Sequence, residues 1–241
     1  MEDMKGIRLN KYISDAGYCS RRDADKWIEE GRVFINGKKG VLGDRVLPGM
    51  KVTVSGERVK SQGRNVYIAL NKPVGIVCTT DKREPANVVD FVDHDRRIYP
   101  IGRLDKDSEG LLLMTSDGDI VNRILRAAGR HEKEYQVTVD KAVTQEFIDK
   151  MQSGVKILGT VTLPCRLKKT GEKAFTIILT QGLNRQIRRM CEALGYRVKS
   201  LKRVRIMNIH LGNLKLGQWR NLTPNEMKEL MRRLDSREAE E

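Results

Sequence analysis

The sequence predicts an α+β protein in which a small helix-rich domain precedes a larger domain built on a mainly antiparallel mixed sheet. Three observations support this class. The 241 residues are enough for one large domain or two modest ones. A polar segment with two glycines, residues 55–65, divides the chain, and we interpret it as a linker. After it, many strand patterns are separated by hairpin-length breaks, with few helices between them. We therefore expect one domain at residues 1–60 and a second at residues 66–235.

The expected elements of the first domain lie between Ile7 and Val59. Apolar residues at helical spacing predict a first helix, which ends at Gly17. Ser20 is expected to cap a second helix, with Asp23 beside the N-terminal amides. The apolar residues of the two helices are Leu9, Tyr12, Ile13, Ala16, Ala24, Trp27 and Ile28. The expected strands are 33–35 and 51–54. Asn36-Gly37, directly after the first strand, is a strong hairpin turn signal.

The second domain alternates between strand and helix patterns. The expected strands are 66–70, 111–115, 134–139 and 175–179. Asn71-Lys72-Pro73 is expected to break the chain after the first of these strands. The expected helices are 120–125, 144–153, 184–194 and a last one that follows Thr223. Asn184 is expected to cap the third helix, and Thr223 and Glu226 form a capping box at the fourth.

The composition indicates a cytoplasmic protein with a genuine core. Hydrophobic residues make up 39% of the chain and charged residues 32%. No apolar stretch approaches the roughly 20 residues that cross a bilayer. The N-terminal residues 1–5 are polar and do not resemble an export signal. The cysteines are widely separated and the histidines do not cluster near them, so we expect no metal site, and we expect Cys191 to lie in the core.

The net charge of +14 favours a polyanionic partner. Basic residues also serve solubility alone, but here they are concentrated near the C-terminal third of the chain. Eight of them accompany one acid between residues 185 and 205: Arg185, Arg188, Arg189, Arg197, Lys199, Lys202, Arg203 and Arg205. Such a concentration favours a binding face. Aromatic residues are only 5%, so backbone contacts and a specific pocket are expected rather than extended base stacking.

A second candidate anion site lies in the first domain. Arg21 and Arg22 fall in the first turn of the second helix, where backbone amides and the helix dipole already favour an anion. An isolated arginine pair usually lies in solvent, but three lysines are expected to share this face: Lys11, Lys38 and Lys39. We therefore interpret these five residues as RNA-binding.

The first domain resembles the alpha-L RNA-binding module of a small-subunit ribosomal protein and of several RNA-modifying enzymes. The resemblance rests on the strings L-N-K-Y-I-S, C-S-R-R-D-A-D and I-E-E-G-R-V-F-I-N-G-K, which cover about a quarter of the chain. It implies that this module binds structured RNA.

A charged loop, residues 102–110, lies between two apolar segments of the second domain and has a glycine at each end. By itself, Asp105 in this loop is more readily read as an ordinary turn residue. The string G-R-L-D-K-D-S-E-G-L-L-L-M-T-S-D-G-D, however, resembles the catalytic signature of the pseudouridine synthases of the RsuA-type branch. Three further strings agree in order and spacing: N-K-P-V-G, K-E-Y and Q-G-L-N-R-Q-I-R-R-M. The resemblance covers residues 66 to about 222.

The resemblance implies roles for three catalytic residues. Asp105 corresponds to the essential aspartate, which acts on the ribose either as a nucleophile or as a base, and the sequence leaves both open. Arg188 corresponds to a basic partner that keeps the aspartate ionised, although a phosphate contact is the alternative. Tyr135 corresponds to an active-site tyrosine that stacks on the flipped base, although a core strand aromatic is the alternative.

Substrate-binding roles are also implied. Leu201 corresponds to a leucine that walls the uridine pocket, but a core leucine is nearly as good an interpretation. Arg103 precedes the aspartate and is expected to hold the backbone or to fill the gap that the flipped nucleotide leaves. We group with them the polar residues around the start of the third helix: Asn184, Arg185 and Arg189.

Other functions remain open at this point. A binding-only RNA chaperone or ribosome-assembly factor would share the RNA-binding module. A different RNA enzyme, such as a methyltransferase, would need a glycine-rich nucleotide-binding turn, and neither GxGxxG nor GxxxxGK[ST] occurs in the sequence. The resemblance implies large-subunit ribosomal RNA as the substrate, with transfer RNA and small-subunit ribosomal RNA as alternatives. We expect no cofactor and a monomer.

Overall fold

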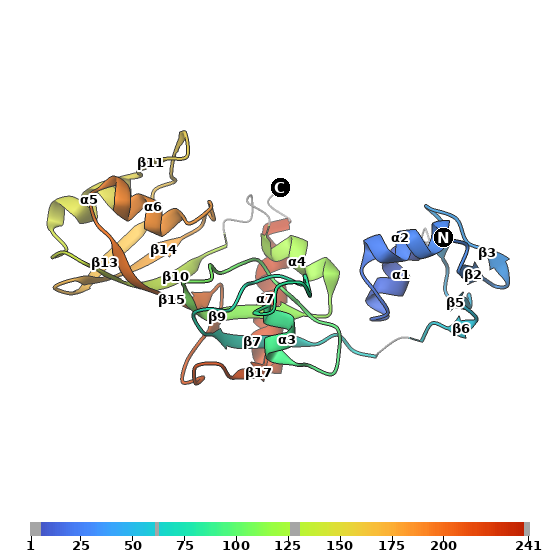
Figure 1. The fold of residues 1–241 in the computed structure, drawn as a ribbon. Coiled ribbons are helices and arrows are strands. Elements are labelled where there is room, and N and C mark those ends of the chain that lie inside the picture. The colour runs from blue at the N-terminus through green and yellow to red at the C-terminus, as the bar shows by residue number, and fades with distance from the viewer. Residues whose placement is uncertain (1–5, 61–62, 126–130, 239–241) are drawn as a thin grey trace. The chain divides into compact units, whose positions relative to one another are not determined.

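The computed structural model describes residues 6–60, 63–125 and 131–238 (Figure 1). Residues 1–5, on which the expectation about an export signal rests, lie outside this part. The chain divides into two compact units. One contains the described residues up to Asn65 together with Ser116–Gly118, and the other contains Val66–Thr115 and the residues from Asp119 onward. No helix in the described part is long and apolar enough to span a membrane.

The first unit contains the two expected helices, α1 (Leu9–Asp15) and α2 (Arg21–Glu29). The apolar spacing buries Leu9, Ile13, Ala24 and Ile28, none of which is more than 2% exposed. The Ser20 hydroxyl accepts a hydrogen bond from the Asp23 amide at 3.1 Å, so the predicted N-cap is confirmed.

Short strands cover these helices. They are β1 (Ile7–Arg8), β2 (Val33–Ile35), β3 (Lys38–Lys39), β4 (Arg45–Val46), β5 (Val52–Val54) and β6 (Glu57–Arg58). Strand β1 pairs with β4, and a sheet has the order β3-β2-β5-β6. Asn36 and Gly37 both have positive φ, 49° and 79°, in the turn between β2 and β3. This is the geometry of the tight hairpin that their sequence predicts.

The expected linker over residues 55–65 was partly wrong. Ser55 and Gly56 form a hairpin turn, because β6 pairs with β5, and Val59 is 3% exposed within the core of the first unit. The sequence pattern does not predict this strand, because both of its residues, Glu57 and Arg58, are polar and exposed. The first unit therefore extends at least through Val59.

The second unit is built on a mixed sheet with the order β13-β14-β10-β15-β9-β7-β17, in which β8 pairs with β9 and β16 with β15. Its strands are β7 (Tyr67–Lys72), β8 (Tyr99–Pro100), β9 (Glu109–Thr115), β10 (Lys133–Val139), β13 (Arg166–Gly171), β14 (Ala174–Leu179), β15 (Val198–Ile206), β16 (Ile209–His210) and β17 (Trp219–Asn221). Among these described strands, β9 and β15 pair in parallel and the other pairs are antiparallel. The mainly antiparallel α+β class is confirmed. The expected break at residues 71–73 was placed too early, since β7 continues through the buried Lys72.

Helices cover both faces of this sheet. They are α3 (Val88–Val92), α4 (Gly118–Leu125), α5 (Gln145–Ser153), α6 (Gln186–Ala193) and α7 (Pro224–Glu238), and a separate hairpin joins β11 (Lys156–Ile157) to β12 (Thr160–Val161). The apolar faces of α5 and α6 pack with β10 and β14, and α4 and α7 pack on one face of β7 and β9. On the other face of β7 and β9, α3 packs with Leu104.

The helix boundaries in the second unit mostly follow local signals. Thr144 caps α5, and Gly154 follows with φ 107°. Thr223 and Glu226 exchange hydrogen bonds at the start of α7, so the predicted capping box is confirmed. Cys191 is fully buried, as expected, and burial raises the pKa of its thiol to about 12. The expected helix over 120–125 buries Ile120 and Ile124, whereas Leu125 at its end is 45% exposed.

Gly110 allows β9 to approach β15. Its φ is +106°, and a Cβ added there would lie 2.3 Å from the carbonyl oxygen of Arg203. We expect Gly110→Ala to lower the free energy of unfolding by about 3 kcal/mol or more, because backbone strain and backbone overlap add. Urea unfolding measures this change. Gly159→Ala is the matched control, since Gly159 also has positive φ but an added Cβ there meets nothing within 4 Å. Equal losses in the two variants would contradict the overlap argument.

Candidate active site

Asp105 lies in a loop between β8 and β9 and lines an open cleft of about 640 Å³. Its side chain is 31% exposed. The cleft is also lined by Cys78, Tyr99, Arg103, Leu104 and Asn184. The structure therefore brings the expected residues Asp105, Arg103 and Asn184 to one concave surface, the usual form of a small-molecule or nucleotide site.

The backbone of this loop is held from several directions. The Gly75 amide, in the N-K-P-V-G string, donates to the Lys106 carbonyl at 2.7 Å. The Leu104 amide donates to the Cys78 sulfur at 3.4 Å, and the Ser108 amide donates to the Asp105 carbonyl at 3.0 Å. These contacts join two strings that are distant in sequence, and they give the loop a defined backbone course.

Arg185 links α6 to this loop. Its guanidinium donates two hydrogen bonds to the Asp107 carboxylate, at 3.0 and 2.8 Å, and also lies 3.8 Å from the Asp105 carboxylate. The hydrogen bond from Arg185 is the main reason that the pKa of Asp107 is lowered. The pairing gives the loop a fork-to-carboxylate contact.

The expected cap of α6 was wrong. The N-cap position is Arg185, with φ 49°, and no side chain accepts a capping hydrogen bond there. Instead, the side chain of Gln186 accepts a hydrogen bond from the Leu183 amide at 3.0 Å. Asn184 is one residue too early to cap the helix, and its carbonyl and side-chain oxygens accept hydrogen bonds from Arg189.

Arg188 is also turned toward the loop, but it contacts the residues after Asp105. It donates to the Asp107 carbonyl at 2.7 Å and to the Ser108 hydroxyl at 3.1 Å, and its Nε lies 3.4 Å from the Asp107 carboxylate. The direct pairing with Asp105 that we expected is not formed. The reason is geometric, since the side chain reaches the loop at residues 107 and 108, while Arg185 lies nearer to Asp105.

Tyr135 and Leu201 occupy neighbouring strands in the middle of the sheet. Tyr135 on β10 is half-buried and contacts both the core under α5 and α6 and the core that contains Leu104. Leu201 on β15 is 5% exposed, packs in the core under α5 and α6 and is in register with Val137. Tyr135 thus lies behind the loop of Asp105, whereas the position of Leu201 matches the alternative interpretation as a core leucine.

The basic residues between 185 and 205 do not all contribute to one face. Arg203 is 3% exposed, and Arg205 forms ion pairs with Glu132 and Glu134. Those two positions are therefore removed from the expected binding face, because the side chain of Arg203 is buried and the guanidinium of Arg205 is bound by two carboxylates. Arg197 and Lys199 are exposed on the surface of the second unit.

The candidate RNA-binding residues of the first unit differ in their surroundings. Arg21 and Arg22 are exposed in the first turn of α2, as predicted, and Lys38 and Lys39 are exposed on β3. Lys11 is half-buried and pairs with Asp15. The side chain of Lys39 passes beside Gly31, which follows the C-terminal end of α2. The five residues therefore reach both ends of α2 rather than its N-terminus alone.

Four residues near Asp105 were not singled out from the sequence. Asp107 and Ser108 lie within the signature string, and Cys78 lies in the cleft wall. Lys72 is fully buried, and its ammonium donates to the carbonyls of Pro73 and Ile76 at 2.8 and 2.9 Å. Burial is the main reason that the pKa of Lys72 is lowered. A lysine at the end of an apolar strand pattern was the available signal for it.

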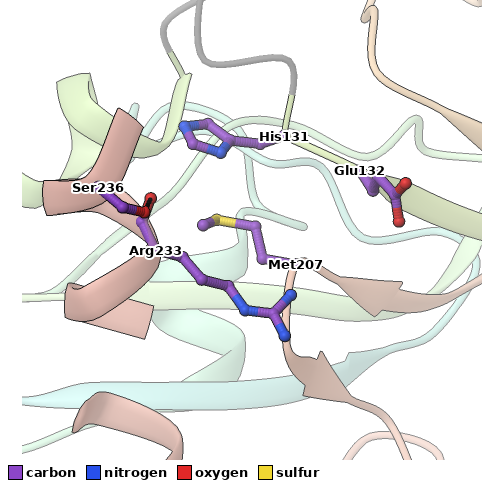
Figure 2. Close-up of a pocket in the computed structure, with 5 residues that line it drawn as sticks. All are labelled: His131, Glu132, Met207, Arg233 and Ser236. Carbon is purple, nitrogen blue, oxygen red and sulfur yellow. Dashed lines mark hydrogen bonds between the residues drawn. The ribbon is translucent and has the colours of Figure 1, made fainter. Parts of the chain in front are cut away.

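A second cavity, of about 230 Å³, lies apart from the expected site residues. It is lined by His131, Glu132, Met207, Arg233 and Ser236, and Figure 2 shows these side chains. Arg233 and Ser236 come from α7, and Glu132 directly precedes β10. Glu132 forms ion pairs with Arg166 and Arg205, and Arg233 forms one with Glu229. Its charged groups are therefore already partnered within the second unit.

Comparison with known proteins gives consistent results. The family model described as RNA pseudouridylate synthase matches residues 66–193, and that of the S4 domain matches residues 7–52. The chain is 56% identical over 236 residues to the dual-specificity RNA pseudouridine synthase RluF of Escherichia coli K12, covering 97% of this chain and 81% of that protein. It is 36% identical over 232 residues to the ribosomal large subunit pseudouridine synthase B of Bacillus subtilis, covering 92% and 95%. A solved structure described as a pseudouridylate synthase aligns with a TM-score of 0.68 at 29% identity, over 93% of this chain and 99% of that one.

Proposed function

The chain belongs to the RNA pseudouridylate synthase family and carries an S4 domain, and on this premise we propose that it isomerises one specific uridine of large-subunit ribosomal RNA. The observation that carries the proposal is the position of Asp105 in a cleft, on a loop held by hydrogen bonds from distant segments. The names of the relatives from Escherichia coli and Bacillus subtilis support the ribosomal substrate. Transfer RNA is the second substrate candidate, because the former relative is described as dual-specificity.

Asp105 is the proposed catalytic carboxylate. The isomerisation breaks the bond between ribose C1′ and uracil N1, turns the base and forms a bond from C1′ to C5, while a proton leaves C5 and one is taken up at N1. A carboxylate contributes either by attacking C1′ or by taking a proton from the neighbouring ribose carbon. Both routes need an ionised and accessible Asp105, and its partial exposure in the cleft supports either one.

The other catalytic and substrate-binding residues act around this carboxylate. Tyr135 contacts the core that includes Leu104, and we assign to it the support of the flipped base. Leu201 packs in the core behind the wall of the uridine pocket. Arg188 holds the loop at Asp107 and Ser108 and so keeps Asp105 in place. Arg103 is exposed at the cleft and is assigned to the gap left by the flipped nucleotide. Asn184, Arg185 and Arg189 are assigned to the flanking RNA backbone.

The two domains have different functions: residues 1–60 bind structured RNA, and residues 66–235 catalyse the isomerisation. Extruding the uridine from its stack costs free energy. Cations of the first domain lie far from Asp105 in sequence, but their contacts with RNA phosphates contribute binding energy that offsets this cost. We assign Lys11, Arg21, Arg22, Lys38 and Lys39 to this contact. We propose further that the protein acts as a monomer in the cytoplasm.

A double substitution tests the first domain. Arg21→Ala with Arg22→Ala is expected to raise the dissociation constant for RNA about tenfold at moderate salt, because about two phosphate contacts are lost. The slope of log affinity against log salt should fall by about two. The rate at saturating RNA should change little, because neither residue lies in the second unit. Lys51→Ala with Arg58→Ala removes two other exposed cations of the first unit and is the matched control. Equal weakening by both pairs would show that only net charge matters.

The substrate is tested by mapping pseudouridine. Ribosomal RNA from cells that lack the gene is labelled with carbodiimide and read by primer extension, and the cells are then complemented with wild type or Asp105→Asn. We expect one lost signal in large-subunit ribosomal RNA that only the wild type restores. An unchanged ribosomal map would direct the search to transfer RNA. A phenotype rescued by Asp105→Asn would favour the second candidate function, that of an RNA chaperone or assembly factor.

A further inference from the structure

The loop of Asp105 is held at its backbone by arginines from two different elements. Arg188 on α6 donates to the carbonyl of Asp107, two residues after Asp105, at 2.7 Å. Arg203 on β15 donates to the carbonyl of Arg103, two residues before Asp105, at 3.3 Å. The Nε of Arg203 also donates to the Leu111 carbonyl of β9 at 2.7 Å. Arg203 therefore ties the loop to the strand that follows it.

Arg203 is an unusual residue to bury. It is 3% exposed, it forms no ion pair with a described carboxylate, and its Nη2 has no hydrogen-bond partner in the described residues. A buried cation without a carboxylate partner is strongly unfavourable unless its donors bind other groups. Arg203 instead donates to the backbone carbonyls of Leu111 and Arg103. A cost of this kind is typical of functional sites rather than of ordinary cores.

The guanidinium fits this bridging task better than an ammonium does. It is planar and presents separate donors in fixed directions, so one side chain can bind carbonyls of two segments at once. The backbone of Arg203 contributes as well, because β15 and β9 pair in parallel at Arg203 and Gly110. The same residue therefore sets the approach of the two strands and the position of the loop.

We propose that Arg203 is a positioning residue of the active site: it holds the backbone before Asp105, opposite Arg188, so that the carboxylate points into the cleft. This inference rests on the proposed catalytic role of Asp105. With the Gly75 amide on Lys106, the carbonyls of residues 103, 106 and 107 are each bound by a different segment of the second unit. Asp105 lies between them, and its backbone has little freedom to shift.

Buried Lys72 supports the same arrangement. Its side chain is fully buried close to the loop, where the carboxylates of Asp105 and Asp107 attract its ammonium and the guanidinium of Arg203 repels it. The attraction between Lys72 and the two carboxylates favours the position of the loop next to the sheet.

The experiment compares Arg203→Met and Arg203→Lys with Arg205→Met in the full chain. Arg205 is the matched control because it lies on the same strand, is 12% exposed at its side chain, and binds Glu132 and Glu134 rather than the loop. The single-turnover rate of pseudouridine formation is measured at saturating concentrations of an unmodified large-subunit ribosomal RNA transcript, together with the RNA dissociation constant. Hydrogen exchange of the peptide covering residues 103–108 is measured without RNA.

Arg203→Met is expected to lower the saturated rate about 100-fold, since a shift of about 1 Å at a catalytic group has an effect of that size. The RNA dissociation constant should change less than about threefold, because Arg203 is not accessible to RNA. Exchange of residues 103–108 should rise. Arg203→Lys keeps the charge but not the fork, and we expect a loss of at least about tenfold. If Arg203→Met does not fold, Arg203→Lys decides.

A saturated rate in the folded Arg203 variants that is within threefold of Arg205→Met, with unchanged exchange in the loop, would overturn the inference. Failure of the proposed function has a different signature, which is an absence of pseudouridine with the wild type and with Arg205→Met on ribosomal and transfer RNA transcripts. In that case the exchange measurement still decides whether Arg203 holds the loop.

Discussion

Asp105→Asn is expected to lower the rate of pseudouridine formation by at least about 10⁴-fold, because the amide neither attacks ribose nor accepts its proton at a useful rate. The substitution preserves the shape of the side chain. The nearest cation, on Arg185, lies 3.8 Å away and is itself held by two hydrogen bonds to Asp107, so the surroundings should keep their geometry. Single-turnover assays at saturating RNA measure the loss directly.

Two further measurements make this result specific to the chemistry. The RNA dissociation constant and the midpoint of thermal unfolding of Asp105→Asn should match those of the wild type, because the side chain is 31% exposed and lies outside the apolar cores. A variant that keeps more than about one hundredth of the wild-type rate would remove Asp105 from its catalytic role. Asp107 would then be the next carboxylate to test, since it shares the loop and the contact with Arg185.

Arg188→Ala is expected to reduce the rate at saturating RNA by about 100-fold to 1,000-fold. It removes the donors to the Asp107 carbonyl and the Ser108 hydroxyl, and Ser108 is fully buried, so its hydroxyl cannot turn to bulk water for a replacement. Rates and dissociation constants are measured separately, because a positioning role lowers the rate whereas a phosphate contact weakens binding.

Arg166→Ala is the control for Arg188→Ala. It removes the same charge from the second unit but loses only a surface ion pair with Glu132. We expect the rate of this control to stay within about twofold of wild type. If Arg188→Ala weakens RNA binding and leaves the saturated rate unchanged, the phosphate-contact interpretation of Arg188 is the correct one.

The contact of Arg185 with Asp107 affects how an RNA phosphate can bind to Arg185. We assigned Arg185 to the flanking RNA backbone, yet in the free protein both arms of its guanidinium are bound to Asp107. A phosphate that approaches Arg185 must therefore share or replace this carboxylate. The low pKa of Asp107 keeps the pair charged across the neutral range, so the exchange does not depend on protonation of Asp107.

Local signals predicted much of the fold correctly. The predicted caps at Ser20 and Thr223 lie within one helical turn of the amides they bind, so a few neighbouring residues are enough to specify them. Alternation of apolar residues correctly predicted β14. The predicted cap at Asn184 was wrong because Arg185, the residue before α6, has a positive φ. Arginine is not a residue type that predicts this conformation.

The sequence by itself determined the order of the elements, the class of the fold and the loop that carries Asp105, because each depends on residue types within short windows or on a recognisable string. Only the tertiary structure decided which side chains meet that loop. Arg188 contacts Ser108 across 80 positions, and Arg203 contacts Arg103 across 100. Such contacts depend on strand order and on the close approach at Gly110, which local patterns do not encode. For that reason the basic cluster of the sequence separates in the structure: Arg197 and Lys199 are exposed, Arg185 and Arg188 contact the loop of Asp105, and Arg203 is buried.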